Sequence, residues 1–457
     1  MSEPRPPVIS PEVDSSTPER RRVVFATVAG TAIEWYDFFL YATAAGLVFT
    51  QIYFEPAGEA MAPVLAFLTV GISFLFRPLG AFLAGHFGDR YGRRLVLMVT
   101  LVLMGASTAL IGLLPSYGSI GLMAPVLLVL LRVLQGISAG GEWGGAALLA
   151  VEHAPTHRRG IFGASPQIGV PLGLLLSSGV LATMTWIAPG EAFLEWGWRV
   201  PFLLSVVLIA IGYYIRRNVD ESPVFSELAE RKKEAHAPII QLFRKHWRLV
   251  LLAALIPAAS QAAGYMTTGG YIQRYATDPA GPVGLRPGEV LWVVTASAIS
   301  WLIFTLVGGA LSDKLGRRKT MVIGWVLLAA ALLVLFPLVD TASTLGLFAG
   351  LTLVTVGLGI VIGPLSAHYT EIFPATVRFS GVSIAYALGA IIGGAFAPTI
   401  AQALVQATGS TIAVTVYLEA MVVVSLIATL LVRDRTGVPL GAEMEDRSDS
   451  SFHGVNA

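Results

Sequence analysis

Long apolar runs alternate with short polar intervals along most of the chain. A helix of about 20 apolar residues is long enough to cross the ~30 Å hydrocarbon core of a membrane. Runs of this length predict twelve membrane-spanning helices, over residues 23–50, 60–84, 94–114, 122–151, 160–187, 197–215, 248–274, 288–310, 320–338, 344–370, 380–406 and 411–432. We therefore expect an all-α membrane protein with both chain ends on the same side of the bilayer.

Lys and Arg residues are distributed unevenly between the two sides of these predicted helices. They are frequent in the intervals that share a side with the chain ends. Five of the opposite intervals contain neither residue, over residues 51–59, 115–121, 188–196, 339–343 and 407–410, and only Arg199, Arg274 and Arg286 lie near that side. Because cytoplasmic loops carry the excess of basic residues, this pattern predicts cytoplasmic termini. The first 22 residues lack the apolar stretch of a cleavable signal and are expected to form a polar tail.

The composition narrows the class of protein further. Of the 457 residues, 55% are hydrophobic and 13% are charged, against about a quarter charged in soluble domains. The net charge of +1 and the dispersed basic residues give no indication of nucleic-acid binding. The chain has no cysteine, and no metal-ligand spacing or nucleophile–base set stands out. We expect neither an enzyme nor a metal site.

The sequence repeats across its longest polar interval. Residues 85–94 (GHFGDRYGRR) recur as 309–318 (GALSDKLGRR), and residues 152–159 share Glu, Pro and Arg at equal spacing with 371–378. The two offsets are similar, which indicates two parallel six-helix repeats. The predicted parts are a polar tail 1–22, a first half 23–215, a linker 216–247, a second half 248–432 and a short tail 433–457.

These repeated motifs resemble the loop motif of the major facilitator superfamily. Other segments resemble its metabolite:proton symporter family: EWYDFFLY at 34–41, RPLG at 77–80, RVLQG at 132–136 and WGWRVPF at 196–202. The resemblance implies a monomeric carrier of the inner membrane that works by alternating access. It also implies import of a small molecule with a proton, such as shikimate, 2-oxoglutarate, proline or betaine, with the proton gradient as energy source and no cofactor.

Within that family we favour a small organic acid such as shikimate or 2-oxoglutarate as the substrate. Arg132 suits a carboxylate, and the tail after Arg435 lacks the heptads that the resemblance associates with osmosensing betaine and proline carriers. Two alternatives stay open, namely uptake of a zwitterionic compatible solute and efflux of a drug or metabolite by the same fold. A membrane receptor is disfavoured because only the tails and the linker lie outside the predicted helices.

Charged residues inside the predicted helices are the candidates for chemistry, since a charge near the bilayer centre costs several kcal/mol. Glu34, Asp37 and Tyr41 share one helix face, and Asp37 lies about 21 Å into its helix, at a depth similar to Arg132. Three interpretations compete. Asp37 carries the transported proton, Arg132 binds a substrate carboxylate, or the two form a permanent structural pair.

Further candidates lie near this pair. Gln135 and Tyr41 are grouped with Arg132 as substrate ligands. Glu142 shares a helix face with Gln135, nearer the cytoplasm, and is either a proton carrier or the partner of Arg77. Glu34 is likewise either a proton carrier or half of an ion pair.

The second half offers polar residues where the first half offers charge. Gln261 and Tyr265 begin a polar stripe at helical spacing, and Tyr386 lies on a later helix. All three are candidate substrate contacts, with ordinary helix packing as the alternative. The repeated loops predict latches between helix ends, through residues Asp89, Arg90, Arg93, Asp313, Arg317, Glu152, Arg159, Glu371 and Arg378, with Arg77 as a further gate residue.

Overall fold

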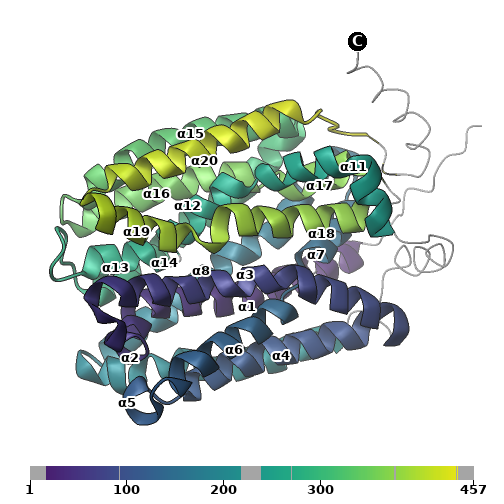
Figure 1. Cartoon of the computed structure of the whole chain (residues 1–457). Coiled ribbons are helices and arrows are strands. Elements are labelled where there is room, and N and C mark those ends of the chain that lie inside the picture. Colours follow the sequence, from purple (N-terminus) through teal and green to yellow (C-terminus); the bar gives the residue numbers. More distant parts are fainter. Residues whose placement is uncertain are drawn as a thin grey trace, which may run out of the picture.

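The structure is a computed structural model that describes residues 17–91, 93–140, 142–217, 238–268, 270–374, 377–438 and 440. Helices are the regular elements in these ranges (Figure 1). The first group is α1 (Thr17–Ala44), η1 (Ala45–Phe49), α2 (Thr50–Ile52), η2 (Glu55–Ala57), α3 (Gly58–Tyr91), α4 (Arg93–Leu113), α5 (Tyr117–Ile120), α6 (Met123–Ser138), α7 (Glu142–Glu152), η3 (Thr156–Arg158), α8 (Arg159–Ile187), η4 (Phe193–Gly197) and α9 (Arg199–Arg217).

The second group follows the predicted linker, of which residues 218–237 lie outside the described part of the chain. Its elements are α11 (Pro238–Leu255), α12 (Ala258–Thr268), α13 (Tyr271–Thr277), α14 (Pro287–Leu315), α15 (Arg317–Val339), α16 (Thr344–Ile362), α17 (Leu365–Ile372), α18 (Arg378–Gly389), η6 (Ala390–Ala395), α19 (Ala397–Thr408) and α20 (Ile412–Leu431). The last residues of the predicted polar tail 1–22 are helical, because α1 begins at Thr17. The last residues of the predicted linker 216–247 are also helical, because α11 begins at Pro238.

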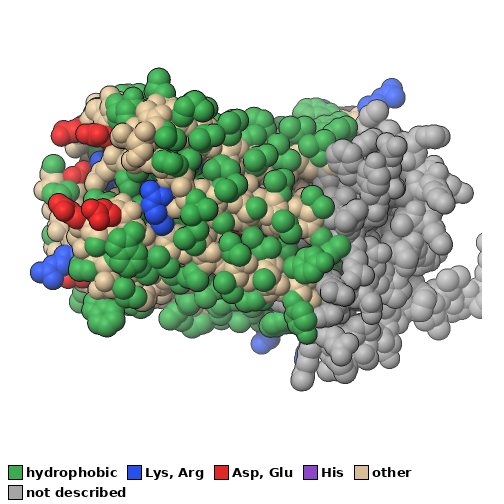
Figure 2. Space-filling view, turned by 90° about the horizontal axis from the view of Figure 1, so that it is seen from below, with side chains coloured by type: hydrophobic (Ala, Val, Ile, Leu, Met, Phe, Trp, Pro, Cys, Tyr) green, Lys and Arg blue, Asp and Glu red, His purple; other side chains and the backbone are tan. Residues whose placement is uncertain are grey.

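The all-α membrane fold is confirmed. Ten helical stretches are long and apolar enough to cross a membrane, and α1 and α4 cover the remaining two predicted runs, 23–50 and 94–114. Large apolar side chains such as Phe82, Trp186 and Val326 are exposed on the surface. Figure 2 shows one face on which apolar side chains cover the middle while the acidic side chains in view gather at one end.

Several of the predicted spans are broken in the structure. The span 344–370 divides into α16 and α17 at Gly363 and Pro364, and the span 248–274 divides at Pro257. Proline has no backbone N–H and displaces the preceding turn, so a helix is interrupted there. In the span 380–406 a π-helical stretch, η6, separates α18 from α19. These breaks turn side chains of one span toward more than one neighbour.

Close packing between helices depends on small residues. The helix α8 packs against α1 on one side and α14 on the other, and so joins the two groups of helices. At one end of the bundle, a Cβ added to Gly270 would lie 1.9 Å from the carbonyl oxygen of Ala42. Inside the first group, a Cβ on Gly136 would lie 2.2 Å from the carbonyl oxygen of Ser73. In lipid, close approach of this kind is a main source of helix association.

We predict that Gly136→Ala destabilises the protein, because the added methyl group has to push α6 away from the α3 backbone. Overpacking of this kind costs about 1–3 kcal/mol. The measurement is the apparent melting temperature of the purified protein in detergent, which should fall by several degrees.

The matched control is Gly145→Ala in α7, where the nearest atom to the added Cβ is 3.8 Å away. It should melt at the wild-type temperature. Equal melting temperatures for the two variants would show that α3 and α6 do not need this close contact.

Candidate functional site

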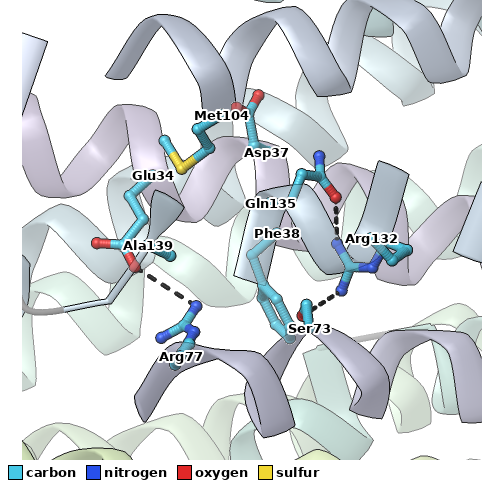
Figure 3. Close-up of a pocket in the computed structure, with 9 residues that line it drawn as sticks. All are labelled: Glu34, Asp37, Phe38, Ser73, Arg77, Met104, Arg132, Gln135 and Ala139. Atoms are coloured by element: carbon cyan, nitrogen blue, oxygen red, sulfur yellow. Dashed lines mark hydrogen bonds and ion pairs between the residues drawn. The ribbon is translucent and has the colours of Figure 1, made fainter. Parts of the chain in front are cut away.

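A small cavity lies inside the first group of helices (Figure 3). Its enclosed volume is about 20 Å³, which is room for about one water molecule. Its lining comes from α1, α3, α4 and α6, with the residues Glu34, Asp37, Phe38, Ser73, Arg77, Met104, Arg132, Gln135 and Ala139. We call it the charged cavity, because four of these side chains are ionisable and each of the four is at least nine-tenths buried.

The guanidinium group of Arg132 is almost fully hydrogen-bonded. It donates to the carbonyl oxygens of Thr69 and Val70, to Oγ of Ser73 and to Oε1 of Gln135, at 3.3, 3.1, 2.8 and 2.7 Å. One face of the group lies 3.8 Å from the centre of the Tyr41 ring. Four of its five N–H groups are therefore used, and the side chain ties α6 to α3 and α1.

The neighbours of Arg132 extend this network. Gln135 donates from Nε2 to Oγ1 of Thr108 at 2.7 Å, which fixes the side chain between α6 and α4. The hydroxyl groups of Tyr41 and Thr69 are 2.6 Å apart. Tyr41 thus packs beneath Arg132 and lines neither this cavity nor the second one described below.

Asp37 differs from Arg132 in how its polar atoms are satisfied. The residue is 3% exposed, and neither carboxylate oxygen has a hydrogen-bond partner among the described residues. The Thr108 hydroxyl is its nearest hydrogen-bonding group, without the geometry of a full hydrogen bond, and the charges of Arg132 and Glu34 also act on it. The structure thus brings Asp37 and Arg132 to one cavity, as predicted, but their side chains do not form a direct ion pair in the described part of the chain.

Arg77 is the second cation of the charged cavity. Its Nη2 lies 3.4 Å from Oε1 of Glu34, and Nε has no hydrogen-bond partner among the described residues. The guanidinium carbon lies 4.5 Å from the centre of the Phe74 ring and 5.9 Å from that of Trp35. Of the two interpretations of Glu34, the ion pair is therefore what the structure displays. Glu142 lies half-buried at the start of α7, and no pair between it and Arg77 occurs in the described ranges.

A second cavity lies between the two groups of helices. Its enclosed volume in this arrangement of the helices is about 20 Å³. Both groups contribute to its lining, with the residues Trp35, Gln167, Val170, Ser260, Gln261, Gly264, Tyr265, Trp301, Ile362, Leu365 and Tyr386. We call it the central cavity. The predicted contacts Gln261, Tyr265 and Tyr386 all line it, and no lining residue is charged.

Polar atoms without partners surround the central cavity. They are Nε1 of Trp35 and Trp301, Nε2 of Gln167 and the hydroxyl of Tyr265, each buried and without a hydrogen-bond partner among the described residues. The amide of Gln167 is oriented by Trp143, whose Nε1 donates to Oε1 at 3.3 Å. Since an indole N–H only donates, the amide N–H groups are left for another acceptor. A ligand rich in acceptor oxygens would satisfy these donors.

Aromatic rings separate the two cavities. Tyr265 is the ring from the second group, and its centre lies 4.8, 5.2 and 5.6 Å from those of Phe38, Phe74 and Trp35. We call these four residues the aromatic wall. On the other side of the central cavity, Trp143 stacks on Tyr386 with ring centres 3.6 Å apart.

A cluster of charges joins the two groups of helices at one end of the bundle, which we call the latch end. Asp313 accepts the backbone N–H groups of Gly160 and Ile161, at 2.7 and 3.0 Å. These donors belong to the first turn of α8, where a carboxylate is stabilised by the helix dipole. Arg317 binds Asp313 at 2.7 Å and Glu371 at 3.1 Å. The geometry is the one that the latch interpretation requires, and the gating role stays a prediction.

The other predicted latch residues also meet at this end. Arg159 lies 3.8 Å from Glu371, and Arg378 lies 3.8 Å from Glu152. Each of these pairs joins one group of helices to the other. The side chains of Asp89, Arg90 and Arg93 lie outside the described part of the chain.

A segment after the last helix covers the latch end and was not expected from the sequence. In this C-terminal segment (433–440), the carbonyl oxygens of Val438 and Leu440 accept from Arg159 and Arg378 at 2.7 and 3.1 Å. Partial burial raises the pKa of Asp434. Hydrogen bonds from Thr436 and from the Arg318 backbone outweigh it, so the pKa lies below its usual value. The segment therefore enters the latch as a charged, hydrogen-bonded element.

Sequence reasoning missed several residues of the central cavity. Gln167 is a lone amide within an apolar run, which is a usable signal for an inward-facing position. The sequence does not distinguish Trp35 and Trp301 from rings of ordinary helix packing, because periodicity does not show where an indole N–H lies. The contacts of the C-terminal segment had no signal, since a short polar stretch has no period.

Comparison with known proteins shows similarity to membrane transporters. Residues 23–243 match the family described as "Sugar (and other) transporter", and residues 275–452 match "Major Facilitator Superfamily". The chain is 42% identical to the "Inner membrane metabolite transport protein YhjE" of Escherichia coli K12, over 91% of this chain and 94% of that protein. It is 36% identical to the "Shikimate transporter" of the same organism, over 91% and 94%.

Two further proteins are similar to this chain, one a relative named for a different substrate and the other a solved structure with the same fold. The chain is 32% identical to the "Proline/betaine transporter" of Salmonella typhimurium LT2, over 94% of this chain and 86% of that protein. A solved structure of the proton:xylose symporter XylE superposes with a TM-score of 0.74, covering 95% of this chain and 100% of that chain. At 18% sequence identity this second likeness concerns the fold alone.

We predict that Asp313→Asn loosens the latch end, because a neutral amide is a weaker acceptor for the α8 N–H groups and a weaker partner for Arg317. The measurement uses Ala367→Cys in α17, which is fully buried and packs against Gly163 of α8. The chain has no other cysteine. Maleimide labelling of this thiol should be several-fold faster when Asp313 is also replaced.

The control is Asp340→Asn, a neutralisation at the C-terminal end of α15, where Asp340 accepts from Tyr275. It should leave the labelling rate unchanged. A rate that does not respond to Asp313→Asn would remove this carboxylate from the latch.

Proposed function

The chain belongs to the major facilitator superfamily of membrane transporters, and we propose that it imports a small organic acid together with a proton. We further propose an inner-membrane location with both termini in the cytoplasm, and movement of the two helix groups as rigid halves around the central cavity. The name of YhjE supports the location, and the name of the shikimate relative supports an acid as substrate. The basic residues predicted on the side of the termini support the orientation.

The charge balance of the charged cavity is the observation that carries this proposal. Glu34, Asp37, Arg77 and Arg132 sum to zero when all four are ionised. A substrate carboxylate that binds beside them adds one negative charge, and an uncompensated charge in this environment is costly. Uptake of one proton restores neutrality, so the binding of an acid and of a proton favour each other.

Asp37 is the best candidate for that proton. Protonation of Arg-paired Glu34 would break an existing ion pair, whereas neither carboxylate oxygen of Asp37 has a hydrogen-bond partner among the described residues. Glu34 and Glu142 are kept as further members of the proton path. In this proposal Tyr41 and Gln135 hold Arg132 in place, and contact with the body of the substrate, apart from its carboxylate, falls to residues that line the central cavity.

The central cavity suits the body of such a substrate. Its unpaired donors are on Trp35, Gln167 and Trp301, and hydroxyl or carboxylate oxygens would accept from them. Gln261 and Tyr386 add polar groups from the second half. The latch-end residues would then hold the cytoplasmic side closed while the opposite side admits substrate.

A zwitterionic compatible solute is the second candidate substrate. The observation that favours it is the ring-lined wall of the central cavity, with Trp35, Tyr265, Trp301 and Tyr386. Such rings attract a quaternary or secondary ammonium group, and one relative is named as a proline/betaine transporter. In the charged cavity, the carboxylate of a zwitterion would add one negative charge that a proton compensates, as the carboxylate of a simple acid does.

The test is uptake into proteoliposomes under an imposed pH gradient, with radiolabelled shikimate, 2-oxoglutarate, citrate, proline and betaine. One coupled proton makes a gradient of one pH unit equivalent to about tenfold accumulation. We predict that Asp37→Asn abolishes this accumulation and spares exchange of internal for external substrate, because the variant cannot release a proton but still binds.

Asp278→Asn is the matched control, since Asp278 pairs with Arg274 far from the cavities and near the end of α13. It should accumulate substrate as the wild type does. Normal gradient-driven accumulation by Asp37→Asn would exclude Asp37 as the proton carrier. Proton-driven movement of substrate out of the liposomes, with no uptake, would favour efflux.

A further inference from the structure

The charged cavity contains two guanidinium groups, and they are not equivalent as ligands for a substrate. We propose that Arg77, and not Arg132, receives the substrate's carboxylate, and that Glu34 occupies Arg77 while the carrier is empty. This inference rests on the proposed function and assigns one of its steps to particular side chains. It changes the role of Arg132 from substrate ligand to structural support.

Arg132 has little capacity left for a ligand. Four hydrogen bonds to α3 and α6 use its three nitrogens, and the Tyr41 ring covers one face. One N–H of Nη1 remains for a single contact, and a carboxylate that bound through Nε and Nη2 would have to displace the carbonyl oxygens of Thr69 and Val70. Those oxygens belong to the α3 backbone, and leaving them unpaired inside the bundle would cost free energy.

Arg77 has the opposite properties. The residue is 8% exposed, and its Nε has no hydrogen-bond partner among the described residues. Its only ion pair in the described part of the chain is the contact of Nη2 with Glu34, which at 3.4 Å is long for a charge-assisted hydrogen bond. A guanidinium group can bind two carboxylates through different edges, so a substrate can approach the Nε edge before Glu34 leaves.

The aromatic wall explains how the substrate would reach Arg77. The guanidinium group packs against Phe74 and Trp35, and Trp35 also lines the central cavity. Tyr265 completes the wall from the other half. When the halves separate, Tyr265 moves away with its own helices, and the two cavities become one. The body of the substrate then lies between the halves while its carboxylate extends to Arg77.

In this arrangement Glu34 is a competitor of the substrate. It neutralises Arg77 in the empty carrier, where an unpaired buried cation would be unfavourable. A substrate carboxylate that arrives must share or replace this partner. Replacing Glu34 with a neutral residue should therefore strengthen the binding of acids, which is the reverse of what a purely structural ion pair predicts.

The test measures binding to the purified full-length protein in detergent by isothermal titration calorimetry. The probes are shikimate, 2-oxoglutarate, benzoate, proline and betaine, each compared with its methyl ester. For a probe that binds to the wild type, the preference is the ratio of its affinity to that of its methyl ester. This ratio should fall by about tenfold or more in Arg77→Gln. Arg77→Lys should keep part of it, because the charge remains and the planar fork is lost.

Two further variants separate the roles. Glu34→Gln should bind the carboxylate several-fold more tightly than the wild type and the ester equally well. Arg132→Lys should melt at a lower temperature and keep the preference for the carboxylate. The melting temperature of each variant identifies any that is misfolded. If Arg77→Gln does not fold, the inference is decided by whether Glu34→Gln binds the carboxylate more tightly or less tightly than the wild type does.

Three results would overturn the inference: an unchanged carboxylate preference in Arg77→Gln, weaker carboxylate binding in Glu34→Gln, or no binding of any carboxylate probe to the wild type. The first two leave the proposed function intact, since proton-driven accumulation and its loss in Asp37→Asn are measured separately in liposomes. Normal accumulation by Asp37→Asn, together with the expected Arg77 results, would contradict the proton assignment alone.

Discussion

The hydrogen-bonded guanidinium group of Arg132 is the interaction on which the first half of the molecule depends. A cation inside a membrane protein is tolerated when its donors are satisfied, and here the α3 backbone supplies two of the acceptors. Because the side chain comes from α6 and rests on Tyr41 of α1, it fixes three helices relative to one another. Asp37 and Arg77, which lie beside this rigid support, keep polar atoms unpaired in the described structure and are available for exchange.

Contacts between the two halves are made at both ends of the bundle. At one end the α8 N–H groups bind Asp313, and at the other Gly270 lies directly against the backbone of Ala42. Between them, Tyr265 packs on three rings of the first half. The structure thus represents a closed form of the carrier. Polar contacts hold the latch end, so its stability depends on charge. Close backbone packing holds the other end, so its stability depends on side-chain volume.

The fold was predictable from the sequence because apolar length alone identifies a membrane helix, and all twelve predicted runs correspond to helices. Pairing of charges was less predictable. Spacing placed Glu34 and Asp37 on one face of α1, but it does not show how neighbouring helices are rotated. The sequence thus offered Glu142 as a partner of Arg77, while the structure places Arg77 beside Glu34. Depth in the membrane brought Arg132 near Asp37 but could not reveal the carbonyl groups that occupy it.

The C-terminal segment has a practical consequence for work on this protein. Its backbone carbonyls accept hydrogen bonds from Arg159 of the first half and Arg378 of the second, so the end of the described chain is attached to both moving parts. Removing Val438 and Leu440 would take one acceptor from an arginine of each half. Shortened versions of the chain should therefore keep this stretch, so that the charges of the latch end retain their backbone partners.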